Sequence, residues 1–122
     1  MSEVIFDSSF LMAVVERPTT WFEDLTEKIG RFDPVALDCV SAELGRLESR
    51  DGKKSRVARV ALELARDFKQ GKCGDGKVDD EILSAALGRG ASVATADRRL
   101  AMTLRKVHVR VVELRSGRVV VP

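Results

Sequence analysis

The chain has 122 residues, with 21 Lys and Arg against 19 Asp and Glu, so its formal net charge is +2. A folded chain of this length hides roughly two-thirds of its unfolded surface, and 44% hydrophobic residues suit one globular core. We therefore expect one ordered domain over residues 1–122. No apolar run approaches the roughly 20 residues that cross a bilayer, and Glu3 and Asp7 stand where a signal peptide needs basic and then apolar residues. We expect a soluble, cytoplasmic protein with no membrane partner.

The sequence offers few cysteine and histidine side chains for catalysis or for binding a soft metal. Cys39 and Cys73 are too far apart in sequence for a CxxC metal knuckle and too few for a disulfide scaffold, so we expect reduced thiols. His108 is the only histidine, whereas serine, cysteine and zinc hydrolases usually recruit imidazole as a base or ligand. Any chemistry is therefore expected to depend on carboxylates.

The first half of the chain alternates apolar runs with amphipathic stretches. Residues 3–7 read as a strand ending in an acid, and a helix follows from Ser8. A second helix is predicted from Thr20, with a stop at Gly30. Residues 34–37 form the next candidate strand, and Asp38 can cap the helix after it.

The second half continues the alternation. It is predicted to contain, in order, a long helix from Ser55 to Gly71, a loop over 71–78, a helix from Asp79 to Gly88, a strand over 91–95, a helix capped by Asp97, a strand over 107–114 and an edge strand over 118–121. Strands that alternate with helices in one small chain predict a three-layer α/β/α fold with a mostly parallel central sheet.

Acids stand at the ends of the predicted strands or the starts of the predicted helices. Asp7 and Asp97 each follow a strand, Asp79 heads a helix, and Glu43 lies in the first turns of another. In open α/β sheets the working site lies beyond the carboxyl ends of the strands, so these four acids can converge. Converging carboxylates repel one another, and a hard divalent cation such as Mg²⁺ or Mn²⁺ relieves that repulsion.

A structural explanation stands beside this one. Helix capping alone accounts for an acid at the positions of Asp7, Asp79 and Asp97. For Glu43 the structural explanation is weaker: it is a solvated acid in the first turns of a helix, where the helix dipole favours it. These structural explanations are less expected to hold for all four acids of one chain than for any one of them.

Four segments in order form a recognisable pattern: VIFDSSFL at 4–11, CVSAEL at 39–44, VDDEILSAA at 78–86 and VATADRRL at 93–100. Together they resemble the PIN-domain nuclease family over essentially the whole chain. The resemblance implies an endoribonuclease that leaves 5′-phosphate and 3′-hydroxyl ends. In it, Asp7, Asp79 and Asp97 hold Mg²⁺ or Mn²⁺, directly or through water, and Glu43 supports the metal or orients the attacking water.

The resemblance also implies auxiliary residues. Thr95 and Ser8 are candidates for hydrogen bonds to the acids, and Asp80 is an auxiliary acid beside Asp79, with the choice of main ligand between them left open. Ala96 stands where family members often have Asn, and Ser8-Ser9 stands where they have Thr-Asn or Thr-Ser.

Within the family, the segment 39–47, the Ala-rich long helix and the Asp79-Asp80 pair look most like the archaeal and eukaryotic PIN proteins of small-subunit rRNA processing. This implies a role in pre-rRNA processing or ribosome biogenesis. Two alternatives stay open: a VapC-type toxin ribonuclease of a toxin–antitoxin pair, and a weakly active or inactive RNA-binding assembly factor. A homodimer or a protein partner is also left open.

Basic residues gather near the C-terminus, where Arg98 to Arg118 contains seven basic residues and one acid, Glu113. Such residues would contact the phosphates of RNA beside an acid-lined site, and the alternative is a solvated surface. The candidate RNA-binding residues are Arg98, Arg99, Arg105 and Lys106.

The segment 71–77 has the GxxxxGK spacing of a phosphate-binding loop. Val78 replaces the Ser or Thr that would contact Mg²⁺, and the prediction places a helix rather than a strand before it. Nucleotide binding is therefore not expected.

Overall fold

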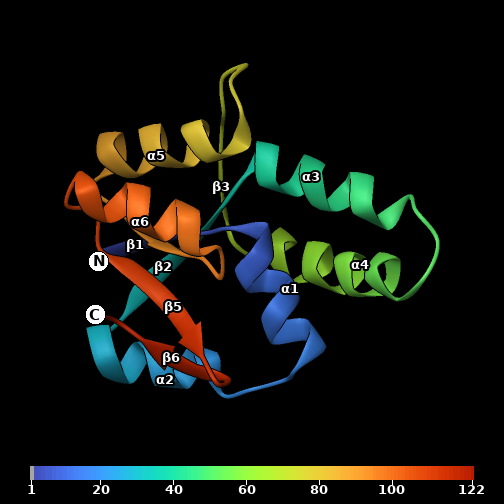
Figure 1. The fold of residues 1–122 in the computed structure, drawn as a ribbon, viewed down its shortest axis with the longest axis horizontal. Helices are drawn as coiled ribbons and strands as arrows, with labels where there is room; N and C mark the ends of the chain where they lie inside the picture. The colour runs from blue at the N-terminus through green and yellow to red at the C-terminus, as the bar shows by residue number, and fades with distance from the viewer. Residues whose placement is uncertain (1) are drawn as a thin grey trace.

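The structure is a computed structural model that describes residues 2–122 (Figure 1). Its strands are β1 (Ser2–Phe6), β2 (Phe32–Leu37), β3 (Lys69–Gly71), β4 (Ser92–Ala94), β5 (Val111–Arg115) and β6 (Arg118–Val120). Its helices are α1 (Ser8–Glu16), α2 (Trp21–Ile29), α3 (Asp38–Glu48), α4 (Lys53–Arg66), α5 (Val78–Arg89) and α6 (Arg98–Lys106). Within the described part of the chain, no helix combines the length and apolar character that a membrane crossing needs.

The strands form one six-stranded sheet in the order β3-β2-β1-β4-β5-β6. All neighbours are parallel except β5 and β6, which pair as an antiparallel hairpin. The predicted α/β fold with a mostly parallel central sheet is confirmed, and so is the edge hairpin.

The chain reverses its direction across the sheet next to β1. Strands β1, β2 and β3 step one way, and β4 and β5 then extend the sheet from the other side of β1. Right-handed crossovers place α1, α3 and α4 on one face and α5 and α6 on the other, as Figure 1 shows. The carboxyl ends of β1 and β4 therefore flank a topological switch point, where open α/β sheets bind their ligands.

Aromatic packing fixes β1 in the centre of this sheet. Phe6 is fully buried, and its ring lies 5.5 Å from Phe10, 5.3 Å from Trp21 and 5.1 Å from Phe68, measured between centroids. Edge-on and tilted contacts of this kind stabilise a core beyond the area they bury. Asp7, the next residue after Phe6, is thus held by a rigid strand end.

Two predicted elements had wrong bounds. The helix predicted from Ser55 to Gly71 begins at Lys53 and ends at Arg66, and residues 69–71 form the edge strand β3 instead. The strand predicted over 107–114 begins only at Val111. His108 lies in the preceding turn with a φ of +64°, so it is not a strand residue.

Glu3 of β1 links two distant elements. Its carboxylate accepts hydrogen bonds from Lys69 Nζ at 2.7 Å and Arg89 Nε at 2.8 Å, and these bonds, that of Arg89 first, lower the pKa of Glu3 to about 2. A carboxyl whose pKa is lower in the folded state stabilises the fold above its unfolded pKa and loses that contribution as the pH falls. The stabilisation from Glu3 is therefore lost between pH 4.5 and about 2.

We expect Glu3→Gln to flatten the loss of stability in that acid range. The difference from wild type should shrink in about 1 M NaCl, because exposed ion pairs are screened by salt. Acid unfolding followed by circular dichroism measures both effects. Glu63→Gln, at an exposed position on α4, is the control, and identical acid curves for Glu3→Gln and wild type would contradict the prediction.

Candidate metal-binding active site

Asp7 is a buried acid at the end of β1. It is 5% exposed, and its Oδ2 accepts hydrogen bonds from Ser9 Oγ at 2.7 Å and Thr95 Oγ1 at 2.8 Å. It occupies the N-cap position of α1 without making a side-chain cap bond. Helix capping therefore does not explain this acid, and the side chains around it hold its charge instead.

Ser9 and Thr95 join the two strand ends at the switch point. Ser9 Oγ also accepts a hydrogen bond from the Ala96 amide at 3.0 Å, and Thr95 Oγ1 accepts one from the Asp97 amide at 3.0 Å. Each hydroxyl thus donates to Asp7 and accepts from the segment after β4. The positions of Asp7 and Asp97 are consequently coupled through Thr95.

Glu43 approaches the same site from the second turn of α3. Its Oε1 accepts a hydrogen bond from Ser8 Oγ at 2.5 Å. The structure therefore places Ser8 on Glu43, whereas Ser9, which the sequence did not single out, contacts Asp7. Successive residues of a helix point about 100° apart, so the two serines reach different acids.

Asp97 has two roles in the fold. Its Oδ1 accepts hydrogen bonds from the amides of Arg99 at 2.8 Å and Leu100 at 3.2 Å, which caps α6 as the sequence predicts. The cap uses one carboxylate oxygen. The other oxygen has no hydrogen-bond partner among residues 2–122.

Asp79 completes the group from the start of α5. Lys77 is the N-cap residue of that helix and Asp79 is its second residue, so Asp79 does not cap the helix. Asp79, Asp80 and Asp97 line one hollow of about 340 Å³ between α5 and α6.

The four acids act on one another electrostatically. Burial raises the pKa of Asp79 above its ordinary value, and the charges of Asp7, Asp97 and Glu43 raise it further. Burial likewise raises the pKa of Asp7, against the hydrogen bonds from Ser9 and Thr95, and Glu43 adds to the rise. Four carboxylates from four separate elements therefore share one field of negative charge.

This donor set fits a hard divalent cation. Carboxylate oxygens are the ligands that Mg²⁺ prefers, and Mg²⁺ usually keeps several waters and takes only one or two carboxylates directly. Within residues 2–122, no three of the four acids have carboxylate oxygens that all lie within 4.8 Å of one another. The spacing is thus too open for a cage built of protein ligands alone, and it suits an ion that retains part of its water shell.

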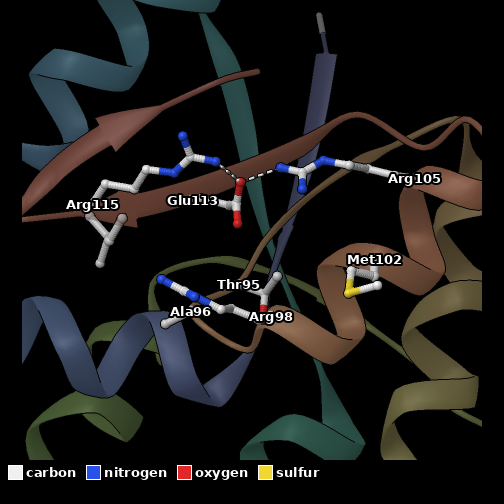
Figure 2. Close-up of a pocket in the computed structure, with 8 residues that line it drawn as sticks. Thr95, Ala96, Arg98, Met102, Arg105, Glu113 and Arg115 are labelled. Carbon is white, nitrogen blue, oxygen red and sulfur yellow. Dashed lines mark hydrogen bonds and ion pairs between the residues drawn. The ribbon is translucent and has the colours of Figure 1, made fainter.

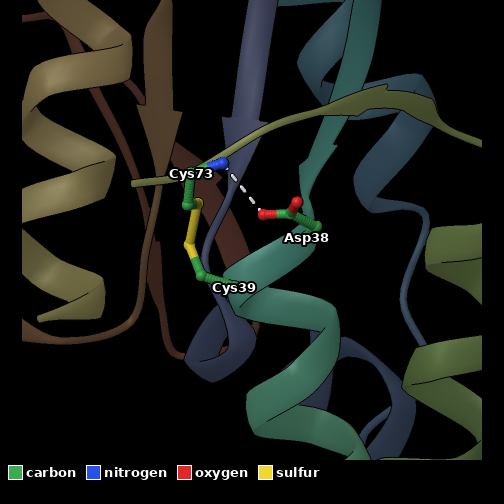
Figure 3. Close-up of side chains that lie close together, drawn as sticks. All are labelled: Asp38, Cys39 and Cys73. Atoms are coloured by element: carbon green, nitrogen blue, oxygen red, sulfur yellow. Dashed lines mark hydrogen bonds between the residues drawn. A yellow bond between two sulfur atoms is a disulfide. The ribbon is translucent and has the colours of Figure 1, made fainter. Parts of the chain in front are cut away.

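The expectation of two reduced thiols was wrong. Cys39 and Cys73 form a disulfide with a Cα–Cα distance of 5.9 Å (Figure 3). Leu37 of β2 and Gly71 of β3 are partners in the sheet, and each cysteine follows its strand by two residues, so the parallel register brings the sulfurs together. Asp38 accepts a hydrogen bond from the Cys73 amide at 2.9 Å. Asp38 and the two sulfurs lie close together, but sulfurs bonded to each other are not thiolate ligands.

The segment 72–77 has a strand before it, contrary to the sequence prediction, and the predicted helix after it. Its interior is filled by an acid, because the Gly74 amide donates a hydrogen bond to Glu81 Oε1. A Cβ on Gly76 would lie 2.7 Å from Glu81 Oε2. The Glu81 carboxylate therefore occupies the place that phosphate takes in a phosphate-binding loop. Nucleotide binding by this segment is accordingly still not expected.

Basic side chains border the acids on the β5 side. A hollow of about 310 Å³ is lined by Thr95 and by three arginines, Arg98, Arg105 and Arg115. Figure 2 draws these side chains. Arg105 and Arg115 both pair with Glu113. Arg98 has no ion-pair partner in the described chain.

The other two candidate RNA-binding residues lie elsewhere on α6. Arg99 lines the hollow that contains Asp79 and Asp97. Lys106 is exposed at the end of α6 and lines neither of these two hollows.

Comparisons with known proteins identify the fold. The PIN domain endonuclease Utp24 superposes with a TM-score of 0.81 at 27% identity, over 98% of this chain and 90% of that one. A domain of a functionally unknown protein from Methanocaldococcus jannaschii gives a TM-score of 0.68 at 13% identity, over 95% of this chain and 93% of that one. PAE2754 from Pyrobaculum aerophilum gives 0.57 at 14% identity, over 87% of this chain and 86% of that one. No curated protein sequence matches significantly. The profile of the family described as a PIN-like domain matches residues 4–117, and the chain therefore belongs to the PIN-domain family.

Proposed function

We propose that the protein is a Mg²⁺- or Mn²⁺-dependent endoribonuclease that acts in rRNA processing. The convergence of Asp7, Glu43, Asp79 and Asp97 at the switch point of the sheet carries the proposal. The structural similarity of the chain to the PIN domain endonuclease Utp24, over 98% of this chain, supports the proposal. The sequence resemblance to PIN proteins of small-subunit rRNA processing supplies the substrate class.

Each residue of the site has a part in the proposed reaction. Asp7, Asp79 and Asp97 would hold the cation, with Asp7 oriented by Ser9 and Thr95. A bound divalent cation supplies an activated water and neutralises charge that develops on the phosphodiester. Glu43, held by Ser8, is placed to orient that water. The one histidine, His108, lies in the turn before β5 and does not line the hollows that Glu43, Asp79 and Asp97 line, so the proposed reaction gives imidazole no part.

Asp97→Asn tests the proposal and separates charge from helix capping. Asn caps helices about as well as Asp, so the amide side chain in this variant keeps the bonds to the Arg99 and Leu100 amides while the negative charge is lost. We expect a loss of cleavage of at least about 100-fold with a thermal midpoint close to that of wild type. The assay uses purified protein, small-subunit rRNA fragments and Mn²⁺, with EDTA as the metal-free arm.

Asp67→Asn is the matched control, because Asp67 is an exposed acid at the end of α4, outside the site. Cleavage that survives both EDTA and Asp97→Asn would show a contaminating nuclease and contradict the proposal. The ends of the products provide a further check, since hydrolysis by this route leaves a 5′-phosphate.

A further inference from the structure

A second basic hollow lies on the side of the acids away from β5. It has a volume of about 470 Å³ and is lined by residues of α1, α3, the turn between α3 and α4, and the start of α4. Ser8 and Glu43 border it, so it opens directly from the acidic site. Its basic residues are Arg46, Arg50 and Lys54, and all three are exposed.

Helix α3 and the turn after it place two of the cations. Glu43 and Arg46 are spaced i, i+3 on α3, so they lie on one face of that helix. Arg50 follows in the turn after α3 ends at Glu48. Lys54 enters the same hollow from the first turn of α4, which packs along α3. The charge on this surface therefore changes from negative to positive within one helical turn of Glu43.

Among the residues that the structure describes, these three cations have no ion-pair partner. The ion pairs within residues 2–122 involve the acids Glu3 and Glu113, and neither contacts Arg46, Arg50 or Lys54. By contrast, two of the three arginines that line the hollow beside β5, Arg105 and Arg115, pair with Glu113. Unpaired like charges around one concave surface repel one another and attract a polyanion.

We propose that this hollow, through Arg46, Arg50 and Lys54, binds phosphates of the RNA strand on one side of the cleaved bond, while the Arg98 side receives the strand on the other. The proposal rests on the proposed function for the identity of the ligand. The partners of the three cations are backbone phosphates, so the contacts carry charge and position but no base sequence. The carboxylates between the two hollows then face the phosphate that is cut.

Binding without cleavage tests the contacts directly. A fluorescent single-stranded RNA is titrated in EDTA by anisotropy at several salt concentrations. We expect the triple variant Arg46→Ala, Arg50→Ala, Lys54→Ala to bind about 10-fold or more weaker, and its plot of log K against log salt to be shallower by about 2, because each lost phosphate contact removes about 0.7 from a single-strand slope.

A second triple variant controls for the loss of three positive charges. Arg56, Arg59 and Arg66 are also exposed on or at the end of α4 but do not line the hollow. Their replacement by Ala should leave both the affinity and the salt slope close to wild type. Equal defects in the two triple variants would overturn the proposal, because they would show an effect of net charge alone.

Shortened substrates test the position of the contacts. RNAs that are truncated on one side or the other of the mapped cleavage site are cut in Mn²⁺. On the series that keeps the nucleotides over this hollow, we expect the triple variant of Arg46, Arg50 and Lys54 to have a lower kcat/KM than wild type. On the series that lacks those nucleotides, we expect the kcat/KM of the two proteins to be equal. A defect of the same size on both series would overturn the proposal.

The two hypotheses fail separately. A wild-type protein that binds RNA with the expected dependence on Arg46, Arg50 and Lys54 but does not cut it would refute the nuclease and support the binding site. A triple variant that cuts and binds like wild type would refute the binding site and leave the nuclease standing.

Discussion

Asp7→Asn should abolish cleavage and, in metal-free buffer, raise the midpoint of thermal unfolding. The carboxylate of Asp7 is buried, and burial raises its pKa. Its charge at neutral pH therefore costs folding free energy. An Asn side chain keeps an oxygen that can accept from Ser9 and Thr95. The rise should be a few degrees, since about 1 kcal/mol shifts a domain of this size by roughly 4 °C.

The contribution of Asp7 to stability changes with pH in the opposite direction to that of Glu3. An acid whose pKa is raised by folding binds its proton more tightly in the folded state, so stability falls as the pH rises from the unfolded pKa, near 3.9, through the raised value. Above that value the loss is complete. Asp7→Asn should remove this fall, so the stability curves of wild type and variant converge at acid pH and separate toward pH 7.

Divalent metal should reverse the order of the two proteins. A ligand that binds only the folded state adds about 2.7 kcal/mol at a concentration 100-fold above its Kd. Mn²⁺ should therefore raise the midpoint of wild type and have a much smaller effect on Asp7→Asn. Thermal scans with and without Mn²⁺, with Asp67→Asn as control, measure this. A variant that cleaves RNA, or one that is less stable than wild type without metal, would contradict the prediction.

The convergence of the acids could be anticipated because it depends on strong sequence signals. The runs before Asp7 and Asp97 are apolar, as expected for central parallel strands. In the structure they form β1 and β4, which are parallel neighbours in the sheet. The carboxyl ends of parallel neighbours lie at one edge. Sequence spacing alone could not assign Ser8 to Glu43 and Ser9 to Asp7, because that depends on the rotation of α1 against α3.

The edge strand β3 shows where sequence reasoning failed and why. Its residues, Lys69 to Gly71, are two polar residues and a glycine, without the apolar alternation that predicts a strand. Hydrogen bonds to β2 create it. Once β3 was missed, the pairing of Cys39 with Cys73 was invisible, because it follows from the β2–β3 register rather than from cysteine spacing.

Loss of the Cys39–Cys73 disulfide should lower the free energy of unfolding by about 4 kcal/mol. The bond spans a sequence separation of 34, and closing a loop of that size removes roughly this much conformational freedom from the unfolded chain. A small domain is stable by only about 5–15 kcal/mol, so this is a large fraction. Urea unfolding of wild type with and without dithiothreitol measures it. The double variant Cys39→Ser, Cys73→Ser should resemble the reduced protein and be insensitive to dithiothreitol.

The loss should appear in stability rather than in the native site. In the folded state, the β2–β3 register and the hydrogen bond from the Cys73 amide to Asp38 still hold the loop against α3. Glu43 lies on α3 with Cys39, and Asp79 lies on α5, the helix after the loop that contains Cys73, so both acids keep their places. Below its lowered midpoint, the double-serine variant should retain a kcat/KM within a few-fold of wild type. Two titratable thiols in the native, unreduced protein, or unchanged stability after reduction, would show that the cysteines are not bonded.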